Sequence, residues 1–379
     1  MTDNKTLWTR PFVQIIAVNF LIFFSFNMLN PTLPVYLKQL EIPDSAIGIF
    51  LSLFTLGSVG MRPFGGHLID NLNKKHLFLL GLCLLGVLIY SYALFQIMAL
   101  LMVVRLLHGL VWGISSTTTS TLATLAIPRA RLGKGMGYFG LSTAFSLAFA
   151  PAVALSILNE ESFTYVIHTS VAMLVLAFLI AIFYPHQEGT RPRKEKSKGL
   201  IERTALLPAT MIACVTLTMS AVTSFISLFA HQLGIENIGS FFTIYAIALL
   251  LVRPLIGTVI DKYGMMVAVM PSLASLMLAL LLLATAQNLP MLLLSGFLYG
   301  AGFGGAQTAL QTLSVMYVPP ERYGVANATF FIGFDIGIGI GALLAGFLSD
   351  VIGYRLMYLW LIAFILFAAL LAVQAQRRH

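Results

Sequence analysis

Residues 61–70 read MRPFGGHLID, and residues 252–261 read VRPLIGTVID. A shift of 191 positions aligns the two stretches and gives four identical pairs: Arg62 with Arg253, Pro63 with Pro254, Gly66 with Gly257 and Asp70 with Asp261. The same shift also gives these pairs: Gly109 with Gly300, Gly113 with Gly304, Thr117 with Thr308, Pro128 with Pro319, Arg131 with Arg322 and Gly133 with Gly324. One fixed offset across three successive apolar stretches indicates that the chain consists of two repeats.

The composition excludes an ordinary water-soluble protein. Hydrophobic residues make up 59% of the chain and charged residues 9%, whereas a soluble domain carries roughly 25% charged residues. A bilayer requires an apolar exterior and confines charges to helix ends, cavities and loops. The formal charge of +8 does not indicate a nucleic-acid partner, because the basic residues lie in loops on one side.

The apolar stretches predict helices, because lipid offers no partner to open backbone groups and the stretches far exceed the segments of a membrane barrel. We therefore predict an all-α membrane protein with twelve transmembrane helices, at 12–37, 45–69, 77–95, 98–127, 136–158, 163–184, 204–231, 238–260, 265–286, 290–317, 325–348 and 356–374. The first stretch lacks a cleavage site and is expected to stay as a span. Cys83 and Cys214 both lie in apolar stretches, so neither a disulfide framework nor a metal site is expected.

Lysine and arginine in the loops predict the orientation, because they favour the cytoplasmic side of a membrane. With a cytoplasmic N-terminus, the outer loops keep only Lys38 and Arg355, and the other loop cations fall inside. The segment 186–203, HQEGTRPRKEKSKGLIER, reads as a flexible cytoplasmic linker. We predict an N-terminal six-helix bundle over 1–185, this linker, a C-terminal six-helix bundle over 204–379, and cytoplasmic termini.

The loop after the second predicted span reads GHLIDNLNKK (66–75), and its counterpart reads GTVIDKYG (257–264). With the repeat, these loops resemble those of the major facilitator superfamily, most of all its drug/proton antiporter (multidrug efflux) branch. The resemblance covers essentially the whole chain. It implies two six-helix bundles that rock around a site at the bilayer midplane, and a monomer in the cell membrane.

In that family the loops latch the cytoplasmic side. Glycine lets helices approach closely, and aspartate can accept hydrogen bonds from a helix N-terminus or a basic side chain. The other interpretation is a tight turn with a solvated aspartate. The candidate latch residues are Arg62, Gly66, Asp70, Lys74, Arg253, Gly257, Asp261, Arg131 and Arg322.

The fourth predicted span contains RLLHG (105–109), which resembles the membrane-embedded arginine motif of the family. An arginine in an apolar stretch is costly and needs a partner or a wet cavity. Helical spacing places five side chains on one face, which we expect to be wet: Arg105, His108, Trp112, Ser115 and Thr119. Alternatively, Arg105 extends to the outer interface and His108 is a packing residue.

Asp335, in FFIGFDIGIGIG (330–341), lies ten residues into its predicted helix, which is roughly 15 Å into a core about 30 Å thick. Such surroundings disfavour an ionised carboxylate, so Asp335 is a candidate proton carrier, with Arg105 and His108 as partners in proton coupling. The repeat places Ala144 opposite Asp335 and Gly296 opposite Arg105. Each half thus contributes one charge that the other lacks. The alternative is a structural ion pair or hydrogen-bonded acid.

Polar and aromatic residues predict a substrate cavity. The resemblance implies that spans one, four, seven and ten line it, and polar stripes occur on those spans. Aromatic side chains could complete an apolar, π-rich pocket, although any one of them could instead face lipid or a neighbouring helix. The candidates are Asn19, Asn27, Asn30, Trp112, Ser115, Ser220, Thr223, Ser227, Tyr245, Tyr299, Gln307, Gln311 and Phe334.

The antiporter signature GxxxGPxxGG of the fifth span is altered here. SLAFAPAVAL (146–155) keeps Pro151 and replaces glycines with Ser146, Ala150 and Ala154. Small residues still permit close helix packing. The departure bears on antiport and not on family membership.

The sequence has no Walker loop, nucleophile elbow or cysteine–histidine cluster. We therefore expect no enzyme, no metal, no nucleic-acid partner and no cofactor other than the coupling proton. The prediction is a secondary active transporter that couples protons to efflux of lipophilic or amphipathic small molecules by alternating access. Two alternatives stay open: a specific transporter of a sugar, metabolite, metallophore or lipid, and a non-transporting membrane sensor.

Overall fold

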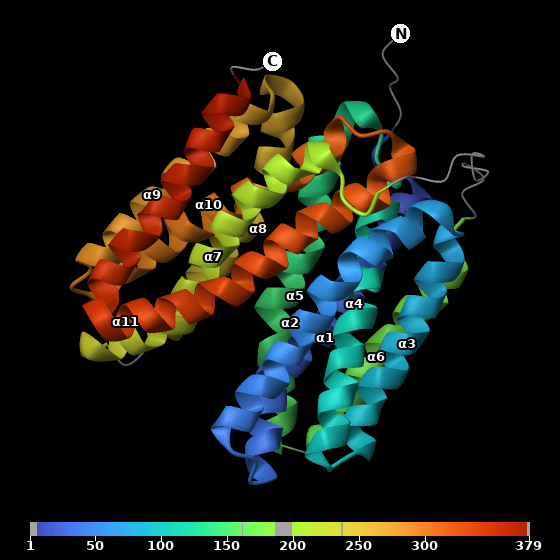
Figure 1. Ribbon diagram of the computed structural model, residues 1–379, viewed down its shortest axis with the longest axis horizontal. Coiled ribbons are helices and arrows are strands. Elements are labelled where there is room, and N and C mark those ends of the chain that lie inside the picture. The colour runs from blue at the N-terminus through green and yellow to red at the C-terminus, as the bar shows by residue number, and fades with distance from the viewer. Residues whose placement is uncertain (1–5, 161, 186–198, 236–237, 377–379) are drawn as a thin grey trace. The chain divides into compact units, whose positions relative to one another are not determined.

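The computed structural model describes residues 6–160, 162–185, 199–235 and 238–376, and helices are its regular elements (Figure 1). Most of the predicted linker 186–203 lies outside these residues. Short 3₁₀ turns at Arg129–Arg131 and Pro320–Arg322 precede α5 and α11. The helices are α1 Arg10–Gln39, α2 Asp44–Asn71, α3 Lys74–Leu94, α4 Met98–Ala126, α5 Leu132–Glu160, α6 Phe163–Ile182, α7 Arg203–Gln232, α8 Gly239–Tyr263, α9 Met265–Thr285, α10 Leu289–Met316 and α11 Tyr323–Gln376.

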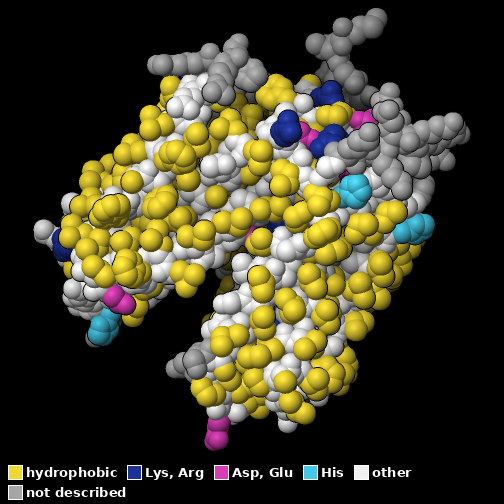
Figure 2. Space-filling view, in the orientation of Figure 1, with side chains coloured by type: hydrophobic (Ala, Val, Ile, Leu, Met, Phe, Trp, Pro, Cys, Tyr) yellow, Lys and Arg dark blue, Asp and Glu magenta, His cyan; other side chains and the backbone are white. Residues whose placement is uncertain are grey.

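Eleven helices in the described part of the chain are long and apolar enough to cross a membrane. Hydrophobic side chains cover most of the face seen in Figure 2. The count differs from the predicted twelve because α11 runs for 54 residues. At 1.5 Å per residue this is roughly 80 Å, far more than a bilayer core.

The backbone of α11 breaks at Gly353, where φ is 75° and ψ is 165°. This is a conformation with positive φ that glycine adopts without a steric penalty. The predicted spans 325–348 and 356–374 lie on either side of this residue. The structure therefore places a backbone break inside α11 at the position where the sequence predicts a loop.

The repeat extends to the helix boundaries. Adding 191 to the bounds of α3 gives the bounds of α9, and adding it to the start of α4 gives the start of α10. The same shift carries Leu132, where α5 begins, onto Tyr323, where α11 begins. The duplication seen in the sequence is thus also a duplication of secondary structure.

Contacts divide the chain into two compact units. Unit 1 comprises 1–128, 142–202 and 318–329, and unit 2 comprises 129–141, 203–317 and 330–379. The predicted bundles 1–185 and 204–379 follow the order of the sequence. The units differ from them mainly in the first turns of α5 and α11, which are grouped with helices of the opposite repeat.

Equivalent glycines allow close helix packing in both units. A Cβ atom on Gly109 of α4 would overlap the carbonyl oxygen of Phe54 in α2. A Cβ atom on Gly300 of α10 would overlap the carbonyl oxygen of Tyr245 in α8 in the same way. Both pairs are related by the shift of 191, so each repeat builds the same backbone-to-backbone crossing, as small residues permit in membranes.

We expect Gly109→Ala and Gly300→Ala each to destabilise the protein by about 1–3 kcal/mol, the usual cost of overpacking. The readout is the melting temperature of the purified protein in detergent. Gly86→Ala is the control, because a Cβ atom there would meet nothing within 4 Å. Equal melting temperatures for all three variants would contradict the packing argument.

Candidate functional site

The carboxylate of Asp70, at the end of α2, binds the N-terminus of α11. Its two oxygens accept hydrogen bonds from the backbone N–H groups of Gly324 at 2.7 Å and Val325 at 2.9 Å. A negative charge is favoured here because the first N–H groups of a helix have no partner inside the helix. We call Asp70, Gly324 and Val325 the first clamp.

Asp261, at the end of α8, binds the N-terminus of α5 in the same way. Its oxygens accept from the backbone N–H groups of Gly133 at 2.8 Å and Lys134 at 2.9 Å. We call these three residues the second clamp. The two clamps are related by the shift of 191, and they have the geometry expected of an aspartate facing a helix N-terminus.

Glycine is required beside each clamp. A Cβ atom on Gly66 would lie 2.9 Å from the carbonyl oxygen of Gly324, and one on Gly257 would lie 2.5 Å from that of Gly133. Any larger residue would push the two helices apart and lengthen the carboxylate hydrogen bonds. The predicted role of Gly66 and Gly257 in close approach agrees with this placement.

Basic residues surround the clamps. Lys74 and Arg322 lie near enough to Asp70 to attract its carboxylate, and Arg131 and Lys134 do the same for Asp261. These positions match the predicted surroundings of the latch. Their positive charges favour the ionised carboxylates on which both clamps depend.

Glu202 was missed by the sequence analysis. Its carboxylate accepts a hydrogen bond from Nε of Arg322, and its backbone N–H donates to the Thr329 hydroxyl at 3.0 Å. The residue just before α7 is thereby attached to the first turns of α11, beside the first clamp. No sequence signal indicated this contact, because Glu202 is one of several acids in a basic linker and its partner lies 120 residues away.

Arg62 was predicted as a latch residue, but it is buried and its Nη1 donates to the hydroxyls of Ser116 and Thr117 in α4, at 3.3 and 3.2 Å. Arg253 donates to the side chain of Gln307 in α10, the position equivalent to Ser116. Both arginines therefore connect the second and fourth helices of a repeat.

Arg253 makes a further hydrogen bond that involves it in the second clamp region, as expected of a latch residue. It donates to the carbonyl oxygen of Gly140 in α5, the helix that Asp261 also holds. Unit 2 thus joins α8 to α5 through one arginine and one aspartate.

Arg105 is buried in unit 1, with 3% of its surface exposed. Its guanidinium carbon lies 4.6 Å from the ring centroid of Phe54 and 5.4 Å from that of Phe50. Arginine over an aromatic face gains electrostatic attraction that is larger without water. The alternative in which Arg105 extends to the outer interface is therefore wrong.

His108 lies one turn further along α4 and is fully buried. Its Nδ1 lies 3.2 Å from the Tyr92 hydroxyl of α3, and Tyr92 also interacts electrostatically with Arg105. Tyr92 was not singled out in the sequence, where it is one of several aromatic residues of an apolar helix. It links the two candidate proton-coupling residues of this unit.

An aromatic stack covers the same region. The Phe26 ring lies 5.0 Å from Phe54 and 4.2 Å from Trp112 by ring centroids, nearly parallel to both. Phe23 packs edge-on against Trp112 at 5.0 Å. We call Phe23, Phe26, Phe54 and Trp112 the aromatic stack. It joins α1, α2 and α4 around the arginine.

The predicted wet face of α4 is wrong. All five of its side chains are buried. Ser115 faces Gly81 of α3, and a Cβ atom on Gly81 would lie 2.5 Å from the Ser115 hydroxyl. Helical spacing correctly placed these residues on one face, but that face packs inside unit 1. Periodicity alone does not distinguish a polar face that meets water from one that meets other helices.

Three nitrogen atoms of this region are buried without a hydrogen-bond partner among the described residues: Nε and Nη1 of Arg105 and Nε2 of His108. An unsatisfied buried donor costs about 1–3 kcal/mol, and more when it is charged. A group with unmet capacity in a dry aromatic environment is a candidate for binding an anionic or hydrogen-bonding ligand.

Unit 2 repeats this arrangement without the charge. The shift of 191 replaces Phe54 by Tyr245, His108 by Tyr299 and Trp112 by Phe303, and the Tyr245 ring lies 6.3 Å from Tyr299 and 6.4 Å from Phe303. Gly296 stands in the place of Arg105, and a Cβ atom there would lie 2.9 Å from the Phe241 ring. Phe241 is the counterpart of Phe50, whose ring packs beside Arg105 in the first repeat, so the aromatic neighbour is kept and the charge is lost.

Asp335 is half-buried in α11. The neighbouring carbonyl of Phe334 accepts a hydrogen bond from the Thr216 hydroxyl of α7 at 3.0 Å, and Gly337 packs against the Ala213 carbonyl. This part of α11 is therefore held closely against α7. Its position in unit 2 is compatible with a proton carrier, and the role stays a prediction.

The remaining candidates for the substrate cavity differ in their contacts and in their exposure. Asn19 connects α1 to α5 by donating to the hydroxyls of Ser142 at 2.8 Å and Thr143 at 3.0 Å, which is a packing contact. The others are placed by exposure as follows: Asn27, Ser220, Tyr245, Tyr299 and Gln311 are buried, Thr223, Gln307 and Phe334 are half-buried, and Asn30 and Ser227 are exposed.

Comparison of the sequence with known proteins identifies its family. The profile of the Major Facilitator Superfamily matches residues 15–237 and 206–378. The quinolone resistance protein NorA of Staphylococcus aureus is 25% identical over 356 residues, which cover 88% of each chain.

Solved structures share the fold. The human organic anion transporter MFSD10 (TETRAN) superimposes with a TM-score of 0.80 at 16% identity, covering 96% of this chain and 98% of that one. A variant of the Escherichia coli fucose:proton symporter FucP gives a TM-score of 0.75 at 17% identity, covering 97% and 99%. The chain belongs to the Major Facilitator Superfamily, and within it is most like the drug/proton antiporter branch.

Proposed function

We propose that this chain is a secondary active transporter that exports lipophilic or amphipathic small molecules in exchange for protons. It would span the cell membrane twelve times, as two six-helix bundles with cytoplasmic termini. The observation that supports the proposal best is Arg105, a buried cation with unmet hydrogen-bonding capacity against an aromatic stack. The relationship to a quinolone resistance protein favours export over uptake.

The aromatic stack suits a flat, lipophilic substrate. Phe26 and Trp112 already stack at 4.2 Å, and aromatic rings prefer offset or edge-on partners worth about 0.5–1.5 kcal/mol each. In this proposal a planar substrate takes the place of Phe26 and stacks on Trp112 instead. Apolar pockets with few polar groups bind drug-sized ligands in general.

The clamps suit the conformational cycle. Each one holds a helix start by two hydrogen bonds to a carboxylate, and bonds to charged groups contribute about 1.5–3 kcal/mol each. Alternating access requires both to open and close once per cycle. Two conformations within a few kcal/mol of each other can then be shifted by substrate or proton binding.

Asp335 and Arg105 are the proposed coupling residues. Proton binding to Asp335 removes a charge from an apolar span, and substrate binding satisfies Arg105. Coupling requires only that the two events favour the two conformations differently. Nothing in this scheme needs a cofactor or a bond-making step, in keeping with a transporter and not an enzyme.

One other function is favoured by a specific observation. The unpartnered Nε and Nη1 of Arg105 leave donors on a cationic group, which favour an anionic partner such as a carboxylate. A dedicated transporter of one metabolite that carries a carboxylate would bind it at the same arginine. Competition of that class of compound against amphipathic dyes distinguishes the two functions.

We expect Asp335→Asn to lower dye transport driven by a pH gradient at least tenfold, because the amide cannot carry the coupling proton. The measurement is ethidium movement in proteoliposomes with an imposed gradient. Asp350→Asn, at an exposed acid of the same helix, is the control and should transport like the parent. Undiminished, gradient-dependent transport by Asp335→Asn would reject the proposed carrier.

We expect Asp70→Asn and Asp261→Asn to open different clamps. Hydrogen exchange should rise about tenfold at Gly324 and Val325 in the first variant and at Gly133 and Lys134 in the second, because one charge-assisted bond of about 1.5 kcal/mol is weakened. Mass spectrometry of the reconstituted protein measures it. Each variant is compared with the other, and unchanged exchange at the clamp that carries the substitution would refute the role of its aspartate.

A further inference from the structure

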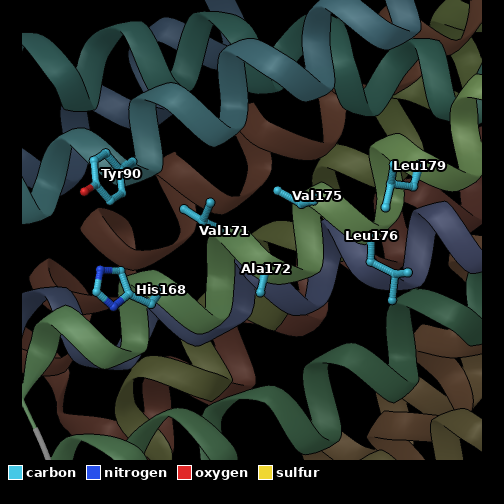
Figure 3. Close-up of a pocket in the computed structure, with 7 residues that line it drawn as sticks. All are labelled: Tyr90, His168, Val171, Ala172, Val175, Leu176 and Leu179. Carbon is cyan, nitrogen blue, oxygen red and sulfur yellow. The ribbon is translucent and has the colours of Figure 1, made fainter.

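An open groove of about 420 Å³ lies between α3 and α6, away from the residues discussed above. Five of its lining residues are apolar side chains of α6: Val171, Ala172, Val175, Leu176 and Leu179. Figure 3 shows them following one helix, with Tyr90 of α3 facing His168 of α6 at one end. The groove is therefore apolar along its length and polar at one end.

The polar end is a pair of stacked rings. The centroids of Tyr90 and His168 are 6.2 Å apart with an interplanar angle of 20°, and Tyr165 packs edge-on against His168 at 6.2 Å. Tyr90 and His168 are both exposed. On a lipid-facing surface, an exposed hydroxyl and imidazole are costly unless they reach a polar partner.

The second repeat provides an internal comparison. The shift of 191 carries Tyr90 of α3 onto Leu281 of α9, and His168 of α6 onto Leu359 of α11. It also replaces Val175 by Leu366 and Leu176 by the bulkier Phe367. The same surface of the second repeat is thus wholly apolar, so the polar pair is specific to the first repeat.

The dimensions of the groove match one leaflet. His168 and Leu179 are eleven residues apart on α6, which is roughly 16 Å of helix and about half the thickness of the hydrocarbon core. Tyr90 and His168 lie within two turns of the adjacent ends of α3 and α6. From there, long side chains with polar tips can reach the headgroup level.

We propose that this groove binds one phospholipid. An acyl chain lies along α6 over Ala172 and Val175, and a phosphate oxygen accepts hydrogen bonds from the Tyr90 hydroxyl and the His168 imidazole. The phosphate gives both exposed groups a hydrogen-bond acceptor at the headgroup level. The site is separate from the proposed substrate region and needs no transport to be detected.

The test is native mass spectrometry of the purified, delipidated protein titrated with dioleoylphosphatidylglycerol. Dioleoylglycerol, with the same chains and no phosphate, and inorganic phosphate, with no chains, separate the two parts of the ligand. We expect one saturable phosphatidylglycerol, with dioleoylglycerol at least tenfold weaker and no retained phosphate. Equal affinity for the two lipids would overturn the headgroup assignment.

Substitutions in the groove test whether these residues bind the lipid. Tyr90→Phe with His168→Phe keeps the ring stack but removes both donors, and should bind phosphatidylglycerol about tenfold more weakly. Ala172→Phe fills the groove and should abolish saturable binding of either lipid. Ala363→Phe, the equivalent change in the second repeat, is the control and should bind like the parent.

Three results would overturn the proposal. They are parental affinity in the double variant, equal loss in Ala172→Phe and Ala363→Phe, or displacement of the lipid by ethidium at concentrations that saturate transport. The last result would make the groove an entry path for substrate. Melting temperatures confirm that each variant is folded.

Discussion

The bilayer cannot solvate a polar group, and this constraint determines most of the structure. Backbone groups are satisfied inside helices, and helices approach closely where glycine removes the side chain, as at Gly109 and Gly300. Every charge within a span then needs a specific partner. Arg105 is surrounded by aromatic rings, Arg253 binds Gln307, and the two clamp aspartates bind helix starts. Stability and function therefore concentrate in the few polar contacts of a largely apolar chain.

Much of the fold could be predicted from the sequence, because apolar length and a fixed repeat are both visible without contacts. The shift of 191 anticipated the clamps, since Asp70 and Asp261 recur with the glycines beside them. The sequence also predicts a loop around Gly353, where the backbone of α11 breaks. Orientation, the number of spans and the bundle boundaries stay predictions, because they depend on the membrane or on long-range packing.

The candidate site was harder to predict, for physical reasons that individual residues illustrate. Helical spacing gave the shared face of Arg105 and His108, but it could not tell that α3 and the aromatic stack cover that face. Tyr92 and Glu202 escaped notice because their roles come from partners distant in sequence. Asn19 looked like a cavity residue and instead connects two helices. Local pattern identifies a polar residue in a span, and tertiary contacts decide what it meets.

The replacement of Arg105 by Gly296 in the second repeat makes the two copies chemically unequal. The aromatic neighbour is present in both copies, as Phe50 and Phe241, but in the second repeat it packs directly against the glycine. A chain assembled from two first halves would hold two like charges and no compensating Asp335. The two copies have thus kept the same backbone packing while their charges diverged, and one half cannot replace the other.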